Sequence, residues 1–314
     1  MRNNRKVIAF LNGGIGNQMF EYALALGVAE RIHAKLVLDV SGYWLYRFRK
    51  LNLMSFVGPA RRTSKMRNLL WSCVLWFVRV VARRMIPQQA HAWLEKFSDG
   101  ILNIDRVSAS SAWVYDPCFM NPNLGGGKNV LILGIYQFLP SLASRDVVIG
   151  EFALSNPASA ASCSYLKQIE DVSVESVSIH VRRGDYTGIS MVLPISYYRQ
   201  AIARLTKSRD GLQMRYFFFS DDPDWCRKEF ADLQDAIFVE GDTKDPTEDL
   251  RLMIACKHHI IANSTFSFWG AYLSVHDSSS MTFCPAKWSP DFATPSTMIP
   301  REWLLVKSFE EGGA

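Results

Sequence analysis

Two adjacent arginines follow a run of apolar residues in the second half of the chain. The segment His180–Tyr186 (HVRRGDY) continues Val177–Val181, which is typical of a buried strand. Functional loops of α/β domains follow their strands, and the arginine guanidinium offers a permanent charge and forked donors that suit phosphate. The pattern therefore indicates an anion site at Arg182 and Arg183. A solvated turn in which Asp185 pairs with an arginine explains the same spacing.

A second candidate follows the apolar segment His259–Ala262. The next residues, Asn263–Gly270 (NSTFSFWG), combine helix-capping side chains with aromatic ones. Free N–H groups at a helix start, together with the helix dipole, form a ready anion site. Taken alone, the segment also fits plain capping by Ser264 with its aromatic side chains in the core.

Two acidic residues, Glu248 and Asp249, open the helix predicted at 247–256. A carboxylate at this place can accept two hydrogen bonds from a guanine edge, although the helix dipole favours acidic residues there in any case. The guanine interpretation requires the first two segments beside it.

A glycine turn, Asn12–Gly16, separates the predicted strand Lys6–Leu11 from the helix predicted at 17–32. With Asp39 after the next strand, the glycines imitate a dinucleotide-binding fingerprint. Met19 stands where that fingerprint needs its third glycine, which disfavours a nicotinamide or flavin site.

Metal-binding patterns are weak in this chain. Asp222 and Asp224 form a D-x-D, by which many sugar-nucleotide transferases hold a divalent cation, but capping of a helix also explains them. None of the six cysteines forms a C-x-x-C pair. His258 and His259 are neighbours on a predicted strand, so they point to opposite faces and cannot share a metal.

The elements that must position these residues alternate between strand and helix. A βαβ unit at 6–40 starts a parallel sheet. Further strands are predicted at 130–136, 177–181, 214–220, 237–240, 259–262 and 281–284, and helices at 196–207, 223–231, 247–256 and 266–275. The Ser- and Ala-rich stretch 150–176 contains the predicted domain boundary. The fold class is therefore α/β, with a doubly wound second domain.

The charge is uneven along the chain. Residues 1–150 hold 19 Lys and Arg against 8 Asp and Glu, whereas residues 151–314 hold 16 against 22. No acidic residue occurs between Val40 and Leu94, which indicates an anionic partner. The helix predicted at 68–86 either lies on an anionic membrane surface or is a core helix with an arginine face. No nucleic-acid fold signature occurs, so nucleic acid is not an expected partner.

No apolar stretch is long enough to span a membrane, and the first residues lack a signal-peptide pattern. We therefore expect a cytoplasmic protein, with the inner face of the membrane as a possible site of action.

These segments together resemble the α-1,2-fucosyltransferases of glycosyltransferase family 11. Several fucosyltransferase families share H-x-R-R-x-D, whereas G-N-Q-M-F and N-S-T-F-S-x-W narrow the resemblance to this one. The matching segments occur in the family's order and are Gly13–Phe20 with Tyr22–Ala23, His180–Tyr186, Tyr216–Asp222, Asp249–Met253, and Asn263–Trp269 with Ala271–Leu273.

The resemblance implies a GT-B-type fold, in which two Rossmann-like domains face a cleft. Residues 1–155 would lie on the acceptor side, and residues 156–314 would bind the GDP-sugar. It further implies inverting transfer of L-fucose from GDP-β-L-fucose to the 2-hydroxyl of a terminal galactose, in an oligosaccharide or lipid-linked glycan. No metal or other cofactor is implied.

Residue roles follow from the resemblance position by position. Arg182 is expected to contact the β-phosphate, Asp249 to read guanine, and Asn17 to lie near the reacting sugar. The full set is catalytic Arg182 and Asn17, and donor-binding His180, Arg183, Ser220, Asp221, Asp249, Ser264, Thr265, Phe266, Gly14 and Gly16.

The general base stays open. Some fucosyltransferases have a glutamate several residues beyond the double arginine, but Gly188–Ser190 contains no carboxylate. Asp185 fits a structural role in its own loop. Glu21, one helical turn from Asn17, and a loose dissociative path with weak base assistance are the alternatives.

Two other functions remain as hypotheses. One is a metal-dependent transferase of another nucleotide sugar, built on Asp222 and Asp224. The other is a non-catalytic basic protein that binds anions through residues 40–94.

Overall fold

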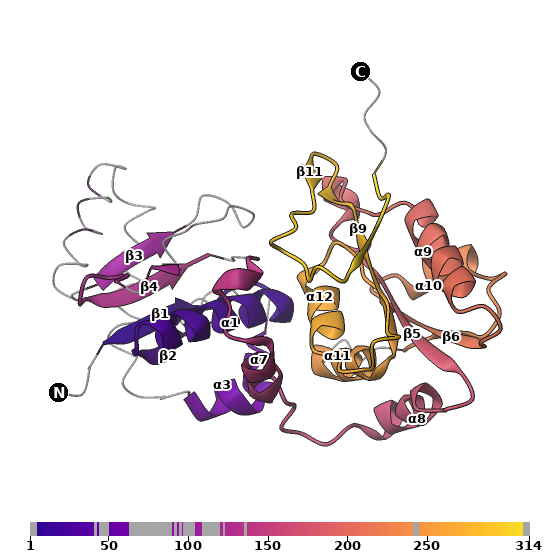
Figure 1. The fold of residues 1–314 in the computed structure, drawn as a ribbon, viewed down its shortest axis with the longest axis horizontal. Coiled ribbons are helices and arrows are strands. Elements are labelled where there is room, and N and C mark those ends of the chain that lie inside the picture. The colour runs from indigo at the N-terminus through magenta and orange to yellow at the C-terminus, as the bar shows by residue number, and fades with distance from the viewer. Residues whose placement is uncertain are drawn as a thin grey trace. The chain divides into compact units, whose positions relative to one another are not determined.

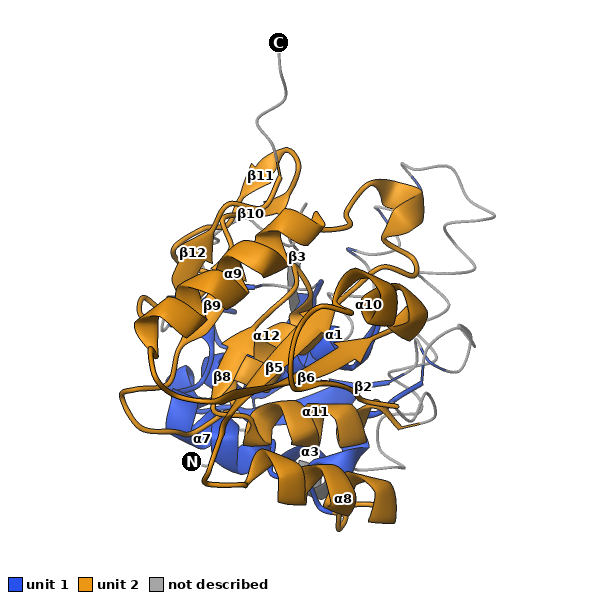
Figure 2. Ribbon diagram, turned by 90° about the vertical axis from the view of Figure 1, so that its right-hand side faces the viewer, with its two compact units in different colours: residues 1–155 blue, residues 156–314 orange. Residues whose placement is uncertain are grey.

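The computed structural model describes residues 5–40, 43, 50–62, 90, 93, 96, 104–108, 120–121, 123–134, 137–240 and 245–309. The chain divides into two compact units, Met1–Ser155 and Asn156–Ala314, which Figure 2 colours separately. Each unit is built on its own parallel sheet, so the predicted α/β class of GT-B type is confirmed. The cleft between the units and the roles assigned to them stay predictions.

Unit 1 contains a four-stranded parallel sheet in the order β2-β1-β4-β3. The predicted βαβ start is confirmed, and Figure 1 shows α1 beside the sheet. The described elements are β1 (Lys6–Phe10), α1 (Ile15–Arg31), β2 (Lys35–Asp39), the 3-10 turn η1 (Leu53–Ser55), α3 (Val57–Arg62), β3 (Ile104–Ser108), β4 (Asn129–Leu133), the 3-10 turn η4 (Leu139–Ser141) and α7 (Arg145–Glu151).

Helix α1 is a core element, because every residue from Gln18 to Ala29 is buried. Gly27 lets the 141–143 segment lie directly on the helix: a Cβ atom there would come within 2.5 Å of the backbone nitrogen of Ala143. That nitrogen donates a hydrogen bond to the Ala23 carbonyl at 3.2 Å. The close approach fixes the helix whose first turn carries Asn17.

Unit 2 contains a six-stranded parallel sheet in the order β12-β9-β8-β5-β6-β7. Read from the other edge, this is the strand order of a dinucleotide-binding Rossmann domain, with the reversal between β5 and β8. The elements are α8 (Ala160–Ile169), β5 (Glu175–Val181), the 3-10 turn η5 (Thr187–Ile189), α9 (Ile195–Ser208), β6 (Met214–Ser220), α10 (Pro223–Glu229), β7 (Ala236–Phe238), α11 (Pro246–Ala255), β8 (His258–Ile260), α12 (Thr265–Tyr272), β9 (Thr282–Pro285), the short pair β10 (Lys287–Ser289) and β11 (Phe292–Ala293), and β12 (Leu304–Val306).

Helices cover both faces of this sheet. Val177, Ile179 and Val181 of β5 pack into a core with residues of α9 and α10. Phe217 and Phe219 of β6 pack on the other face against α8 and α11. Figure 2 shows α9 and α10 on one side of β5 and β6, and α8 and α11 on the other. Burial on both faces explains why these strands are apolar runs in the sequence.

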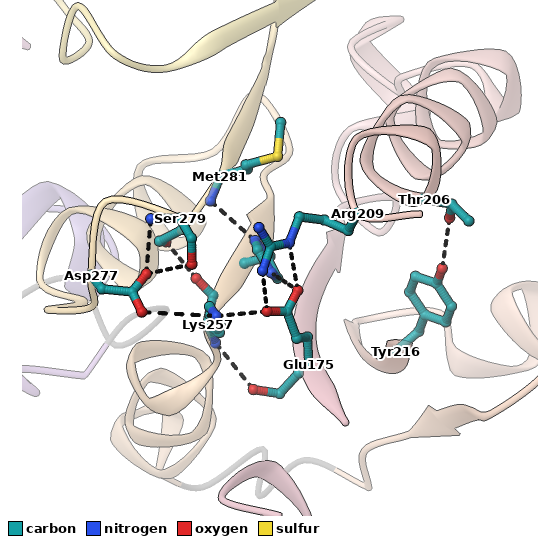
Figure 3. Close-up of polar contacts among 11 residues, drawn as sticks. Glu175, Thr206, Arg209, Tyr216, Lys257, Asp277, Ser279 and Met281 are labelled. Carbon is teal, nitrogen blue, oxygen red and sulfur yellow. Dashed lines mark hydrogen bonds and ion pairs between the residues drawn. The ribbon is translucent and has the colours of Figure 1, made fainter. Parts of the chain in front are cut away.

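A charged network fixes the amino-terminal edge of the same sheet (Figure 3). Glu175, which opens β5, pairs with Arg209 after α9 and with Lys257 before β8, at 2.5 and 2.6 Å. Its other oxygen lies 3.0 Å from Nε2 of His258, whose Nδ1 accepts a hydrogen bond from the backbone of Met281. These hydrogen bonds, led by that of Arg209, lower the pKa of Glu175 below its usual range. The network joins β5, β8 and β9 far from the strand ends that carry the candidate site.

Several elements were not predicted. Helix α8 lies in the Ser- and Ala-rich stretch that contains the predicted domain boundary. It was not predicted because its apolar side chains gather only in its last turns. Strand β12 at the sheet edge is three residues long, and β3 precedes β4 without a clear apolar pattern. Strand β4 ends at Leu133, before Gly134 with its positive φ, whereas a strand to Tyr136 was predicted. The predicted helix 68–86 lies outside the described residues.

Replacing Gly27 with alanine is expected to lower the free energy of unfolding by about 1–3 kcal/mol, because the new methyl group meets backbone that cannot give way. Gly150 in α7 is the matched control: a Cβ there meets nothing within 4 Å, so alanine is expected to be neutral or stabilising by up to about 1 kcal/mol. Urea unfolding of both variants measures the difference. Equal urea midpoints for the two variants would contradict the close packing of the 141–143 segment on Gly27.

Candidate active site

The two candidate anion-binding segments follow the two strands between which the strand order of unit 2 reverses. His180–Tyr186 ends β5 and leaves it, and Asn263–Thr265 leaves β8. Ligands of open α/β sheets bind at the carboxyl ends of the strands beside this reversal. The topology therefore brings together residues that are about 80 positions apart.

Arg182 is held by carboxylates on both arms of its guanidinium. Its Nη1 lies 2.8 Å from Oδ2 of Asp221, the residue that follows β6. Its Nη2 lies 2.7 Å from Oδ1 of Asp185 in its own loop. Asp221 also accepts a hydrogen bond from the backbone nitrogen of Arg183 at 2.9 Å. Asp221 thus links the loop after β5 to the strand next to it.

Arg183 points to helix α10. Its Nε lies 2.9 Å from Oδ2 of Asp222, and its guanidinium stacks on the ring of Trp225 at 4.2 Å from the centroid. Asp222 also caps α10, since its Oδ1 accepts a hydrogen bond from the backbone nitrogen of Trp225. Ser220 supports the same turn by accepting a hydrogen bond from the backbone of Asp222 at 3.0 Å.

The D-x-D pair is engaged in local structure. Asp222 serves the cap and the arginine, and Asp224 pairs with Arg227 at 2.9 Å. Among the described residues, no group of three or more His, Cys, Asp or Glu side chains is arranged to hold a metal ion. The capping explanation is confirmed for Asp222, which is the N-cap of α10.

Tyr186 connects Arg182 to the start of helix α12. The guanidinium carbon of Arg182 lies 5.6 Å from the centroid of the Tyr186 ring. The hydroxyl of Tyr186 donates a hydrogen bond to the carbonyl of Asn263 at 3.2 Å. Because Asn263 directly precedes the helix cap, the arginine and the residue before the helix start contact the same tyrosine.

Helix α12 begins as its sequence predicts. The Ser264 hydroxyl accepts a hydrogen bond from the backbone nitrogen of Phe266 at 3.3 Å, and Thr265 is the first helical residue. Phe268 and Trp269 are buried in the core, as the capping interpretation expected. Phe266 is half-buried and packs on His180, with ring centroids 5.6 Å apart.

His180 is buried beneath this helix start, with 5% of its surface exposed. Burial, assisted by the charge of Arg182, lowers its pKa to about 3, so the ring is neutral at physiological pH. Within the part of the chain that the structure describes, its Nδ1 has no hydrogen-bond partner. His180 therefore supports the site as a neutral, buried group and not as a cation.

Asn263 was not among the predicted site residues, yet it ties three segments together. Its side-chain nitrogen donates to the carbonyls of Met191 and Trp288, both at 2.9 Å, and its own carbonyl accepts from Tyr186. It is 1% exposed. The motif containing Asn263 was recognised in the sequence, but its partners lie 72 and 25 residues away.

Asp249 lies in the first turn of α11 and is half-buried. Helices that follow strands of a parallel sheet begin at the carboxyl edge, so α11 starts at the same edge as the arginines. Its neighbour Glu248 has a structural role, since it accepts a hydrogen bond from the backbone of Ser159 at 2.8 Å and pairs with Arg251 at 3.3 Å. The guanine contact of Asp249 stays a prediction.

The glycine turn of unit 1 follows β1, beside which the strand order of that sheet also reverses. Gly13 has a φ of 74°, and a Cβ there would lie 2.8 Å from the side-chain nitrogen of Asn17. Gly14 caps α1 with open space above it, while Gly16 is buried in the first helical turn. The turn therefore lets the half-buried Asn17 lie directly over the backbone.

Gln18 holds this turn in place, a role the sequence did not predict. It is fully buried and uses its whole amide: Nε2 donates to the carbonyls of Gly13 and Lys50, and Oε1 accepts from the backbone of Asn52 and Leu53. These four hydrogen bonds connect the glycine turn to a segment more than 30 residues away.

Glu21 is not placed to act as a general base. Only 1% of it is exposed, and both carboxylate oxygens accept hydrogen bonds from Asn12, at 2.8 and 2.7 Å. Burial raises its pKa well above the usual value. Glu21 therefore stabilises the glycine turn from inside the unit, and the identity of the general base stays open.

Comparison with known proteins decides the family. The model of glycosyl transferase family 11 matches residues 139–306. An α-1,2-colitosyltransferase of Escherichia coli is 30% identical over 96% of this chain and 99% of its own length. The chain belongs to glycosyltransferase family 11. The resemblance drawn from the sequence motifs is thereby confirmed for the family, and this family 11 protein is a glycosyltransferase.

Two further similarities concern part of the sequence and the fold. A galactoside α-(1,2)-fucosyltransferase 1 of Sus scrofa is 27% identical over 52% of this chain and 48% of its own length. The solved structure of an arginine-to-lysine mutant of Arabidopsis thaliana FUT1 in complex with GDP has a TM-score of 0.53 and 12% identity. That alignment covers 96% of this chain and 76% of the plant chain, and it supports the fold.

Asn263→Asp is expected to destabilise this family 11 enzyme by about 3 kcal/mol or more. The change keeps the side-chain shape but faces two carbonyls with a buried carboxylate in place of a donor. Asn156→Asp, on an exposed residue of the same unit, is the control and is expected to change stability by less than about 0.5 kcal/mol. Chemical unfolding compares the stability of the two variants. A similar loss of stability in both would contradict the role of Asn263 in joining three segments.

Proposed function

We propose that this family 11 enzyme is an inverting galactoside α-1,2-fucosyltransferase. It transfers L-fucose from GDP-β-L-fucose to the 2-hydroxyl of a terminal galactose, and it needs no metal ion. The single observation that carries the proposal is that Tyr186 contacts both Arg182 and the residue that precedes the α12 cap.

The chemistry of the leaving group explains why that placement matters. When the bond from the anomeric carbon of fucose to the β-phosphate oxygen breaks, negative charge grows on the diphosphate and the sugar becomes oxocarbenium-like. Fixed positive groups lower the energy of this transition state because they need no reorganisation. Arg182 supplies a permanent charge, and the N-terminus of α12 supplies the positive end of the helix dipole.

The remaining predicted residues fit supporting roles. His180 is a neutral, buried group that packs on Phe266 at the start of α12 and would support the diphosphate site, and Arg183 adds a second charge that stacks on Trp225. Asp249 would read guanine, and Ser220 and Asp221 would line the nucleoside pocket. Asn17 belongs to unit 1, and the proposal places it beside the reacting sugar.

The donor sugar has a second candidate. The full-length similarity to an α-1,2-colitosyltransferase favours colitose, which is L-fucose without its 3-hydroxyl. A site that hydrogen-bonds this hydroxyl rejects the deoxy sugar strongly, whereas an apolar site discriminates weakly. GDP-fucose and GDP-colitose therefore need to be compared as donors.

The acceptor is proposed to be a galactose-terminated oligosaccharide or lipid-linked glycan. No helix in the described part of the chain is long and apolar enough to cross a membrane. Contact of the predicted helix 68–86 with an anionic membrane surface stays a proposal, since that segment lies outside the described residues.

Incubation of the full chain with each GDP-sugar, in EDTA, with lactose and with type 1 and type 2 disaccharides tests the proposal. We expect a fucosylated or colitosylated product, and a loss of about 100-fold or more in kcat for Arg182→Ala. Arg204→Ala, which removes an exposed arginine of α9, is the matched control and should retain activity.

Complete inhibition by EDTA, reversed by a divalent cation, would favour the metal-dependent alternative. Full activity of Arg182→Ala would contradict the role of the arginine.

A further inference from the structure

We propose that the donor diphosphate exchanges places with Asp185 on Arg182, whereas Asp221 keeps its hold on the arginine throughout turnover. Return of Asp185 to Arg182 then helps GDP to leave. The inference rests on the proposed function, because it requires a GDP-sugar at Arg182.

The net charge of the arginine cluster, which consists of two arginines and the three carboxylates paired with them, disfavours binding of a diphosphate. Two cations, Arg182 and Arg183, are paired with three carboxylates, Asp185, Asp221 and Asp222. At neutral pH the cluster therefore carries one net negative charge. If the cluster did not change, an approaching diphosphate would be repelled by the carboxylate nearest to its binding position.

Asp221 has the contacts of a fixed partner. It comes from the end of β6, binds Nη1 of Arg182 with one oxygen and the backbone nitrogen of Arg183 with the other, and is 26% exposed. Gly184 packs directly on it, since a Cβ there would lie 2.7 Å from Oδ2. To move, Asp221 would have to break two hydrogen bonds and leave a close contact.

Asp185 has the contacts of an exchangeable partner. It lies three residues from Arg182 on the same loop, and 51% of its side chain is exposed. Ion pairs at such exposure contribute little to stability, because water and salt screen them. Rotation of this side chain toward solvent would release Nη2 of Arg182 to the diphosphate.

The exchange has a consequence for turnover. A site with only cations would bind GDP tightly and release it slowly. A carboxylate that returns to Nη2 competes with the product for the same donor, so it weakens GDP binding after the sugar has been transferred. Asp185 is thus a positioning residue that acts through Arg182.

Calorimetric titration of the full chain with GDP, in EDTA, compares Asp185→Asn with Asp221→Asn. Both variants remove one negative charge from the same arginine and keep the side-chain shape, so a general charge effect would move both Kd values down together. We expect Asp185→Asn to bind GDP about threefold tighter or more, with a lower kcat as GDP release slows. We expect Asp221→Asn to bind GDP about threefold more weakly or worse.

Guanosine is the ligand control, since it lacks the diphosphate, and its Kd should be unchanged by Asp185→Asn. If Asp221→Asn does not fold, Asp221→Glu tests the same contact, because it keeps the charge and displaces the carboxylate; it too should weaken GDP binding.

Unchanged or weaker GDP binding by Asp185→Asn would overturn the inference while leaving the proposed function intact. Equal tightening by both asparagine variants would also overturn it. Failure of the wild-type chain to bind GDP would overturn the proposed function and the inference together.

Discussion

A permanent positive charge held still at the carboxyl edge of a parallel sheet is the constraint on which the account depends. Arg182 carries that charge. Asp221, which follows β6, holds its Nη1, and its guanidinium lies over the ring of Tyr186, whose hydroxyl donates a hydrogen bond to the residue before the α12 cap. A flexible arginine would lose entropy and solvation when the transition state forms. An arginine fixed beforehand has incurred that cost during folding.

The fold provides this rigidity through elements far from the arginine. The β5–β8 pair is joined at its other end by Glu175, Lys257 and His258, so the two strands that carry the anion-binding loops are fixed at both ends. Asn263 joins the two loops themselves. In unit 1, the hydrogen bonds of Gln18 and the close packing at Gly27 fix helix α1.

The parts of the molecule that were predicted from the sequence are those in which a local residue pattern indicates the secondary structure. Apolar runs predicted the strands buried on both faces, and strand ends predicted the loops with His180, Arg182 and Ser264. Helix α8 and strand β12 lacked such patterns. The roles of Gln18, Asn263 and Asp221 depend on partners 25 to 72 residues away, and no spacing within a motif reveals these contacts. Family resemblance marked some of these residues without explaining them.

A structure of the full chain crystallised with GDP in the presence of EDTA tests the central claim most directly. We expect both phosphorus atoms to lie beside the guanidinium of Arg182 and the N-terminus of α12, with Asp221 still on Nη1. A diphosphate bound away from both the arginine and the helix start, or one that binds there only through an added divalent cation, would contradict it.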